Sequence, residues 1–145
     1  MSRSGYSDEY EHVGLWRQAV KRATTGYRGQ HLLRRLRDAL NAMPVKRLIP
    51  DAIRNEAGEV CALGALDPTA PYDDAEALAQ HFGIACALAA EIVYVNDEHP
   101  IDCQRGIDGL WSSSKETPEA RWVRMRAWVD QQIVPPQTDD EEPTC

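Results

Sequence analysis

Residues 78–92 read Leu78-Ala79-Gln80-His81-Phe82-Gly83-Ile84-Ala85-Cys86-Ala87-Leu88-Ala89-Ala90-Glu91-Ile92, and this pattern predicts two short helices that meet at a glycine. Gly83 is suited to the left-handed conformation that often follows a helix end. Asp73 or Asp74 can cap a first helix over Ala75–Phe82. An alanine-rich second helix is expected over Ile84–Val95. The stretch therefore favours a helical fold.

The same pair of helices has the spacing of a helix-turn-helix unit, in which the second helix can read DNA. Polar side chains are needed for that, and the positions that would face the groove are Ala85, Cys86, Ala87, Ala90 and Glu91. Residues 73–98 also contain six acidic residues and no Lys or Arg, which phosphate groups would repel. We therefore favour a structural helical hairpin and keep a DNA-binding regulator as the alternative.

Helical periodicity extends to both sides of this hairpin. Ser7 can cap a first helix that ends near Gly26, and a second helix is expected over Gly29–Met43, stopped by Pro44. Thr117-Pro118-Glu119 combines a cap, a proline at the first helical position and an acid in the first turn, so it predicts the start of a last helix. Most of the chain between these limits should therefore be helical.

Two segments have weaker patterns. Lys46–Arg54 and Glu59–Leu66 flank a possible four-residue turn, which fits a short β-hairpin. The alternative is a helix over Ile49–Asn55 followed by a turn and a helix over Cys61–Leu66, and we favour a helix for that second segment. His99–Lys115 shows no periodicity, and we expect it to be a long surface loop.

The predicted fold is mainly α: a single compact domain of five or six helices, with one short β-hairpin as an option. The domain should cover residues 7–134, between a disordered N-terminus at 1–6 and a disordered acidic tail at 135–145. The expected core consists of apolar residues at helical spacing: Trp16, Leu32, Leu36, Leu40, Leu63, Leu66, Leu78, Phe82, Ile84, Leu88, Ile92, Trp122, Met125 and Val129.

The chain has 145 residues, which suits one domain with a real core. It contains no stretch of about 18 apolar residues and no apolar signal-peptide core near Met1, so we expect a cytoplasmic protein that does not enter a membrane. Four cysteines form no C-x-x-C pair: Cys61, Cys86, Cys103 and Cys145. We expect Cys61 and Cys86 to be small core residues.

The net charge of −7 hides a strong asymmetry. Residues 1–54 hold 11 Lys and Arg against 5 Asp and Glu, whereas residues 55–145 hold 5 against 18. Seven basic residues without an intervening acid form the most basic segment: Arg17, Lys21, Arg22, Arg28, Arg34, Arg35 and Arg37. Such a segment can bind phosphate or carboxylate groups of a partner, or it can pair with the acidic half of the same chain.

The chemistry of an enzyme has weak support. Phosphate-loop, dinucleotide-binding, zinc-protease and serine-hydrolase motifs are absent from the sequence. Asn96-Asp97-Glu98 could supply a general base, but a polar helix end explains it more simply, and Ser112-Ser113-Ser114-Lys115 fits a solvated loop. A metal site from His81, Cys86, His99 and Cys103 matches no standard zinc spacing. We expect no enzyme activity, metal or cofactor.

Five segments together resemble a known pattern. They are Arg47-Leu48-Ile49, Val60-Cys61-Ala62-Leu63-Gly64-Ala65-Leu66, Phe82-Gly83-Ile84, Asn96-Asp97-Glu98, and Thr117-Pro118-Glu119-Ala120-Arg121-Trp122. They are similar to an uncharacterised family of small bacterial and phage proteins, over residues 27–133. The resemblance implies no established activity, so it assigns no functional residue. The chain departs from the pattern by an apparent insertion at Pro100–Ser114, where Trp111 is the type of residue that anchors interfaces.

The sequence thus favours a non-enzymatic accessory protein of bacterial or phage type that binds a macromolecular partner, for example an inhibitor of a host system. The basic segment from Arg17 to Arg37 is the predicted contact surface, for a protein or a nucleic acid. The acidic half could instead contact a basic partner. The sequence contains no indication of the oligomeric state.

Overall fold

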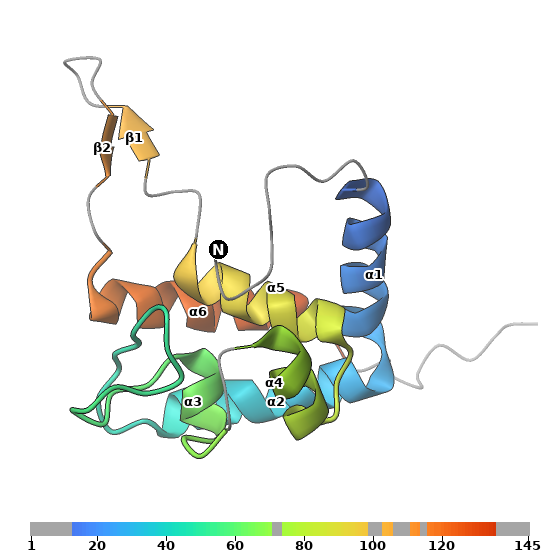
Figure 1. Cartoon of the computed structure of the whole chain (residues 1–145), viewed down its shortest axis with the longest axis horizontal. Helices are drawn as coiled ribbons and strands as arrows, with labels where there is room; N and C mark the ends of the chain where they lie inside the picture. The colour runs from blue at the N-terminus through green and yellow to red at the C-terminus, as the bar shows by residue number, and fades with distance from the viewer. Residues whose placement is uncertain (1–12, 71–73, 99–102, 106–110, 114–115, 136–145) are drawn as a thin grey trace, which may run out of the picture.

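The computed structural model describes residues 13–70, 74–98, 103–105, 111–113 and 116–135. In these ranges the elements are α1 (Val13–Thr25), α2 (Tyr27–Ala42), α3 (Ala62–Leu66), α4 (Ala75–Phe82), α5 (Cys86–Asp97), β1 (Cys103–Arg105), β2 (Trp111–Ser113) and α6 (Pro118–Gln132). The predicted fold class is confirmed: the chain is a mainly helical, single compact domain (Figure 1). The expectations for residues 1–6, for the cap at Ser7 and for the acidic tail beyond residue 135 lie outside the described residues.

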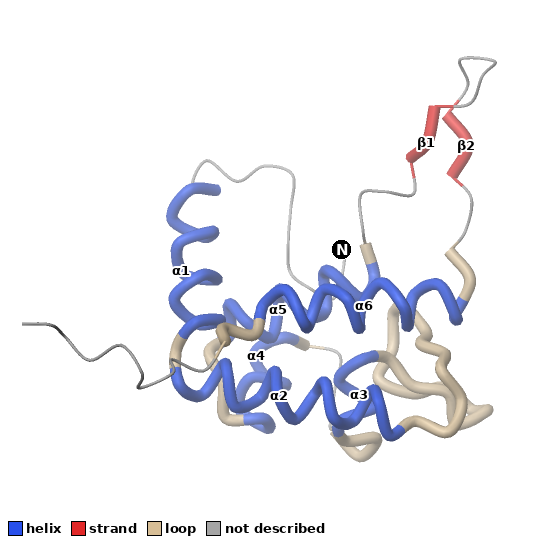
Figure 2. The backbone as a smooth tube through the Cα atoms, turned by 180° about the vertical axis from the view of Figure 1, so that it is seen from behind, coloured by secondary structure: helices blue, strands red, loops and turns tan. Residues whose placement is uncertain are grey.

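The helices α2, α5 and α6 run lengthwise through the molecule, and α1 rises from the end where α2 begins (Figures 1 and 2). The short helix α4 forms the hairpin with α5, while α3 lies against α2. The side chains that meet between these elements are almost all aliphatic, led by Leu32, Leu33, Leu36, Leu40, Leu48, Leu63, Leu78, Leu88, Ile92, Val93, Met125 and Val129. Burial of this apolar surface is the main stabilising term of the fold.

Most of the predicted core is buried, including all three leucines predicted on α2. Four predicted members are only partly buried: Trp16, Leu66, Phe82 and Trp122. All of these except Trp16 pack against the core. Among the largest fully buried side chains, three were not predicted: Leu33, Leu48 and Val93. Aromatic rings are large, so they commonly close the margin of a core while smaller aliphatic groups fill its centre.

The helix caps follow the predicted chemistry. The Asp74 carboxylate accepts hydrogen bonds from the backbone N–H of Glu76 and Ala77, and Gly83 has a left-handed φ of 69°. Thr117 Oγ1 accepts from Ala120 N at 3.1 Å at the start of α6. The predicted start of α5 was two residues early, because Ile84 N donates back to Ala79 O and so belongs to the end of α4.

The corner between α1 and α2 is tighter than predicted. Only Gly26 separates the two helices, and α2 begins at Tyr27 rather than at Gly29. A Cβ on Gly29 would lie 2.0 Å from the carbonyl oxygen of Ala23 and 3.1 Å from Leu88 Cδ2. The absence of a side chain at Gly29 is therefore what lets the end of α1 rest directly on α2.

We expect Gly29→Ala to lower the free energy of unfolding by about 2 kcal/mol, since the new methyl group must push a backbone carbonyl away. Urea denaturation followed by circular dichroism measures this change. Gly14→Ala is the matched control, because no heavy atom of the described chain lies within 4 Å of a Cβ at this helical position. It should be neutral or slightly stabilising, and equal losses of stability in the two variants would contradict the tight corner.

The segment between α2 and α3 combines parts of both alternatives. α3 confirms the helix favoured for Cys61–Leu66, whereas the helix considered over Ile49–Asn55 is wrong. Asp51 has a φ of 68°, which breaks a right-handed helix. Arg54 and Val60 form an isolated antiparallel bridge, so the hairpin exists only as a single pairing.

The segment His99–Lys115 is not the uniform loop that we predicted. β1 and β2 pair as an antiparallel hairpin, with Cys103 opposite Ser113, Gln104 opposite Ser112 and Arg105 opposite Trp111 (Figure 2). Strands of three residues are too short to produce a recognisable alternation of apolar and polar residues. The one short hairpin of the described chain thus lies between α5 and α6.

Candidate functional site

The basic segment is divided by the structure into two groups. Arg17 belongs to the first, because its Nη1 donates to both carboxylate oxygens of Glu91 at 3.0 and 2.9 Å. The Glu91 side chain on α5 is only 7% exposed. Arg17 and Lys21 also line a cleft of about 480 Å³ between α1, α5 and the end of α6, with Trp128 among its other walls. Arg17 therefore compensates an internal acid and does not belong to an outward basic surface.

Most other cations of the described chain also have partners. Arg37 Nε donates to the neighbouring carboxylate of Asp38 at 3.3 Å. Carboxylates also pair with Arg47, Arg121, Arg124 and Arg126, and backbone carbonyls accept from Lys46 and Arg54. Within the part of the chain that the structure describes, the cations without an ion pair or a side-chain hydrogen bond are Lys21, Arg22, Arg28, Arg34 and Arg35. All five lie on α1 and α2.

Four of these arginines form a continuous exposed surface together with two ring side chains. We define the outer face as Arg22, Tyr27, Arg28, His31, Arg34 and Arg35, all of which are exposed. On α2, His31 lies three or four residues from each of the other four members, so all five share one side of the helix. Arg22 joins them across the corner, where it lines a pocket of about 210 Å³ with Tyr27 and Arg28.

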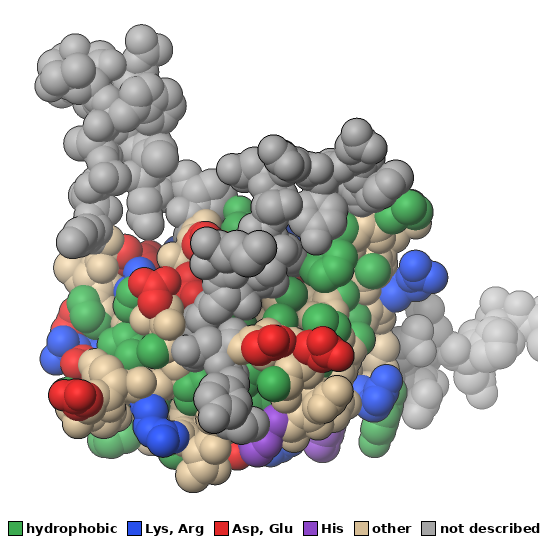
Figure 3. Space-filling model, viewed as in Figure 1, with side chains coloured by type: hydrophobic (Ala, Val, Ile, Leu, Met, Phe, Trp, Pro, Cys, Tyr) green, Lys and Arg blue, Asp and Glu red, His purple; other side chains and the backbone are tan. Residues whose placement is uncertain are grey.

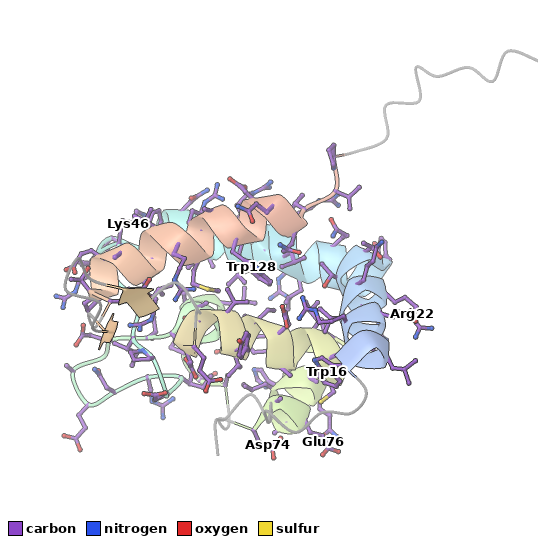
Figure 4. All side chains as sticks on the ribbon, turned by 90° about the horizontal axis from the view of Figure 1, so that it is seen from above. Trp16, Arg22, Lys46, Asp74, Glu76 and Trp128 are labelled. Atoms are coloured by element: carbon purple, nitrogen blue, oxygen red, sulfur yellow. The ribbon has the colours of Figure 1, made fainter. Side chains whose placement is uncertain are left out.

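Figures 3 and 4 show the part of this surface that lies on α1. Arg22 points outward from α1 (Figure 4), and Lys and Arg side chains lie along the right-hand edge over α1 (Figure 3). Acidic side chains gather in the middle of the same view, over α4, which carries Asp74 and Glu76. The charge asymmetry of the sequence is therefore also an asymmetry of the folded surface. The exception on the outer side of α2 is Asp38, which pairs with Arg37.

Neither Tyr27 nor His31 was predicted to belong to the contact surface. Their rings stack with centroids 6.4 Å apart and an angle of 14° between the planes. The second helix was predicted to begin at Gly29, so Tyr27 lay before it. Its four-residue spacing to His31 therefore did not indicate that the two rings share a helix face. A helix start two residues earlier would have shown both rings on one face.

The helix-turn-helix alternative lacks a surface on the second helix that could contact DNA bases. α4 and α5 are bent against each other by 116°. Of the residues that would face the groove, Ala85 and Cys86 are exposed, but Ala90 and Glu91 are buried against the rest of the domain. Glu91 is held by Arg17, so it cannot turn toward a base.

The metal hypothesis finds no support in the described residues, which contain no group of three or more potential ligands. His81 Nε2 lies 2.7 Å from Asp67 Oδ2. Hydrogen bonds from the Thr69 side chain and from His81 lower the pKa of Asp67 to about 2. Cys86 was predicted to be a core residue, but its side chain is exposed. The part of it that is buried, together with nearby Glu76, raises the pKa of its thiol, which disfavours the thiolate. His99 and the side chain of Cys103 lie outside the described residues.

In the Asn96-Asp97-Glu98 segment, Asn96 and Asp97 connect separate segments of the fold through hydrogen bonds. The Asn96 side chain is buried, and its Oδ1 accepts from Ala62 N at 3.1 Å. Its Nδ2 donates to Ile49 O at 3.0 Å and to Asp97 Oδ1 at 2.7 Å, and Asp97 Oδ1 also accepts from Asp51 N. Asn96 and Asp97 therefore bond the end of α5 to the two segments around the bridge rather than facing a substrate.

A second network that the sequence did not reveal lies beside Asn96. Arg121 Nε donates to Asn96 O at 2.9 Å, and Arg124 donates to the carbonyls of Val95 and Asn96. The Glu116 carboxylate, which is 9% exposed, pairs with Arg121 at 3.3 Å and with Arg124 at 2.7 Å. We call Glu116, Asn96, Arg121 and Arg124 the polar hub.

Four of the five segments that carry the resemblance meet at this hub, and Phe82-Gly83-Ile84 is the exception. Leu48 N donates to Pro118 O, Ile49 O and Ala62 N bond to Asn96, and Arg121 belongs to the helix that Thr117 starts. The pattern thus corresponds to one set of mutually bonded positions, whose role in this structure is to hold α3, α5 and α6 together.

No protein-family model, curated protein or solved structure matches the chain. No single helix of the described residues is both long and apolar enough to cross a membrane; α4 and α5 meet those criteria only when taken together, as a bent pair.

Proposed function

We propose that this protein is a non-enzymatic accessory protein, of the bacterial or phage kind that its sequence resembles, and that it binds nucleic acid through the outer face. The observation that carries the proposal is the set of four exposed arginines, Arg22, Arg28, Arg34 and Arg35, which have no partner among the described residues. Among the side chains that the structure describes, the Lys and Arg outside α1 and α2 are paired or hydrogen-bonded.

The physical support is local charge rather than net charge. Potential at a surface depends mainly on charges within about one Debye length, roughly 8 Å at physiological salt. Arg34 and Arg35 are adjacent on α2, and Arg28 lies six and seven residues before them, about 9–10 Å along the axis and so close to one Debye length away. The outer face is therefore positive although the chain carries −7. Guanidinium groups bind phosphate oxygens in a bidentate manner, and such interactions supply most non-specific affinity for nucleic acid.

The test is nucleic-acid binding measured against salt concentration, with fluorescence anisotropy of a labelled oligonucleotide. We expect the affinity of the wild type to fall steeply as salt rises, since each neutralised phosphate releases counterions. Arg34→Ala combined with Arg35→Ala should weaken binding. The slope of log K against log salt should become shallower by about 0.7 for each phosphate of a single strand that the variant no longer neutralises. Both residues are exposed, so the double variant should fold normally.

The matched control also removes two arginines, by combining Arg47→Ala with Arg54→Ala. These residues lie outside α1 and α2, where Arg47 pairs with Glu59 and Glu119, and Arg54 donates to Pro68 O. The control changes net charge by the same amount and should leave the salt slope unchanged. Absence of binding at about 50 mM salt, or an equal decrease of affinity in the control, would overturn the proposed function.

A further inference from the structure

The outer face carries an aromatic ring that is almost entirely free. Tyr27 is 88% exposed, the most exposed of the large hydrophobic residues in the described chain. It packs only loosely on His31, with 6.4 Å between the ring centroids, so one face of the tyrosine ring stays open to solvent. The open face of this ring offers apolar surface on which the ring of a partner can stack.

Arginines lie near this ring on both helices. Arg22 on α1 and Arg28 on α2 share the small pocket with Tyr27 at the α1–α2 corner. Arg34 and Arg35 stand two turns further along α2, about 10 Å from Tyr27 along the axis at 1.5 Å per residue. The ring therefore lies at the corner end of the positive surface, next to Arg22 and Arg28, and the other two arginines follow it on α2.

We infer, as a refinement that rests on the function proposed above, that the outer face binds single-stranded nucleic acid, with an unpaired base stacked on Tyr27 and the flanking phosphates held by Arg22, Arg28, Arg34 and Arg35. Stacking on an exposed aromatic ring needs the open face of a base, which a duplex hides within its own stack. The combination of an exposed ring with flanking cations is the general design of single-strand binding surfaces.

The size of the surface sets the length of strand that it can hold. A distance of about 10 Å along α2 corresponds to roughly three nucleotides at a spacing of about 3.4 Å. Asp38 lies one turn beyond Arg34 and pairs with Arg37, so the positive surface ends there. The expected footprint is thus short, and binding should depend on the sequence of bases only weakly, because every base offers a ring for stacking.

The experiment compares three fluorescein-labelled probes at equal salt: an oligothymidylate of about 12 nucleotides, an oligouridylate of the same length and a DNA hairpin duplex. We expect the wild-type protein to bind the single strands more tightly than the duplex. A difference between the two single strands would assign the sugar that is preferred, and either preference supports single-strand binding. Duplex binding that is as tight as single-strand binding would overturn the inference.

Tyr27 variants separate stacking from charge. Tyr27→Ala should weaken single-strand binding by about tenfold and leave the salt slope unchanged, since no charge is removed. Tyr27→Phe should retain the wild-type affinity, because the ring remains. Val123→Ala, which removes an exposed apolar side chain on α6, is the control and should have no effect.

The two levels of the proposal fail in different ways. Salt-dependent binding that is indifferent to Tyr27→Ala would overturn base stacking and leave the basic surface in place. Absence of salt-dependent binding to all three probes would overturn the proposed function together with it. Circular dichroism of each variant establishes that a weaker affinity does not come from unfolding, and at Tyr27 little change is expected because the side chain is exposed.

Discussion

Asn96→Ala is expected to lower the free energy of unfolding by about 4 kcal/mol, a large fraction of the stability of a domain of this size. Asn96 is 1% exposed, and its side chain bonds two distant residues, Ala62 and Ile49, as well as the neighbouring Asp97. Its removal leaves Ala62 N–H and Ile49 C=O without these partners, and each unsatisfied buried group costs about 1–3 kcal/mol. Urea denaturation followed by circular dichroism measures the change.

Two further variants make this expectation specific to the buried amide. Asn41→Ala removes an asparagine whose Oδ1 accepts from Arg126 at an exposed site, and the loss of stability should stay below about 1 kcal/mol. Asn96→Asp retains the acceptor for Ala62 N but brings an anionic oxygen toward Ile49 O and Asp97. It should therefore destabilise at neutral pH at least as much as alanine. Similar losses of stability at Asn41 and Asn96 would show that the hub does not hold the fold together.

The second large effect is expected from Glu116→Ala, which should lower the free energy of unfolding by about 3–5 kcal/mol. Glu116 is the carboxylate that pairs with both Arg121 and Arg124, and all three side chains are mostly buried. Removing it leaves two guanidinium charges in a site with little water. Glu116→Gln, which keeps the shape and loses the charge, should cost less than alanine because an amide oxygen can still accept one hydrogen bond.

Glu119→Ala is the control, three residues further along the same segment. Glu119 pairs with Arg47 at 3.2 Å, but its side chain is 61% exposed. Exposed ion pairs contribute about 0–1 kcal/mol, so this variant should be nearly neutral and its small effect should vanish in high salt. Equal losses of stability at the two glutamates would contradict the buried character of the hub.

Local chemistry explains why the sequence was informative about the helices. A cap at Asp74, a left-handed glycine at Gly83 and a cap at Thr117 involve atoms within three or four residues, so their signals are visible in the sequence. The leucine spacing on α2 was sufficient to identify its buried face for the same reason. These features positioned the helices to within about two residues.

The polar hub could not be predicted from local sequence signals of this kind. Asn96 contacts residues 34 and 47 positions earlier in the chain, and Arg121 reaches it from 25 positions later. A polar cluster at a helix end normally faces water, and only the packing of three helices turns Asn96 inward. Long-range interactions of this kind leave no periodic signal.

The candidate surface was predicted in part. Seven basic residues indicated the pair of helices that carries the outer face, but Arg17 pairs with the buried carboxylate of Glu91 and Arg37 pairs with its neighbour. Which of several adjacent arginines face an internal acid depends on helix packing, which composition does not contain. The exposed ring of Tyr27 was missed because the predicted helix began two residues late.

The order of the helices along the chain has a consequence for biosynthesis. α6 contributes Met125 and Val129 to the core and bonds to the end of α5 through the hub. The Gln30 side chain bonds to the backbone of Gln132 and Val134 at the end of α6. Translation delivers α6 after every other described helix. Until it leaves the ribosome, α2 and α5 have no cover for the leucines between them, so the nascent chain must stay protected from self-association until almost the whole domain has been made.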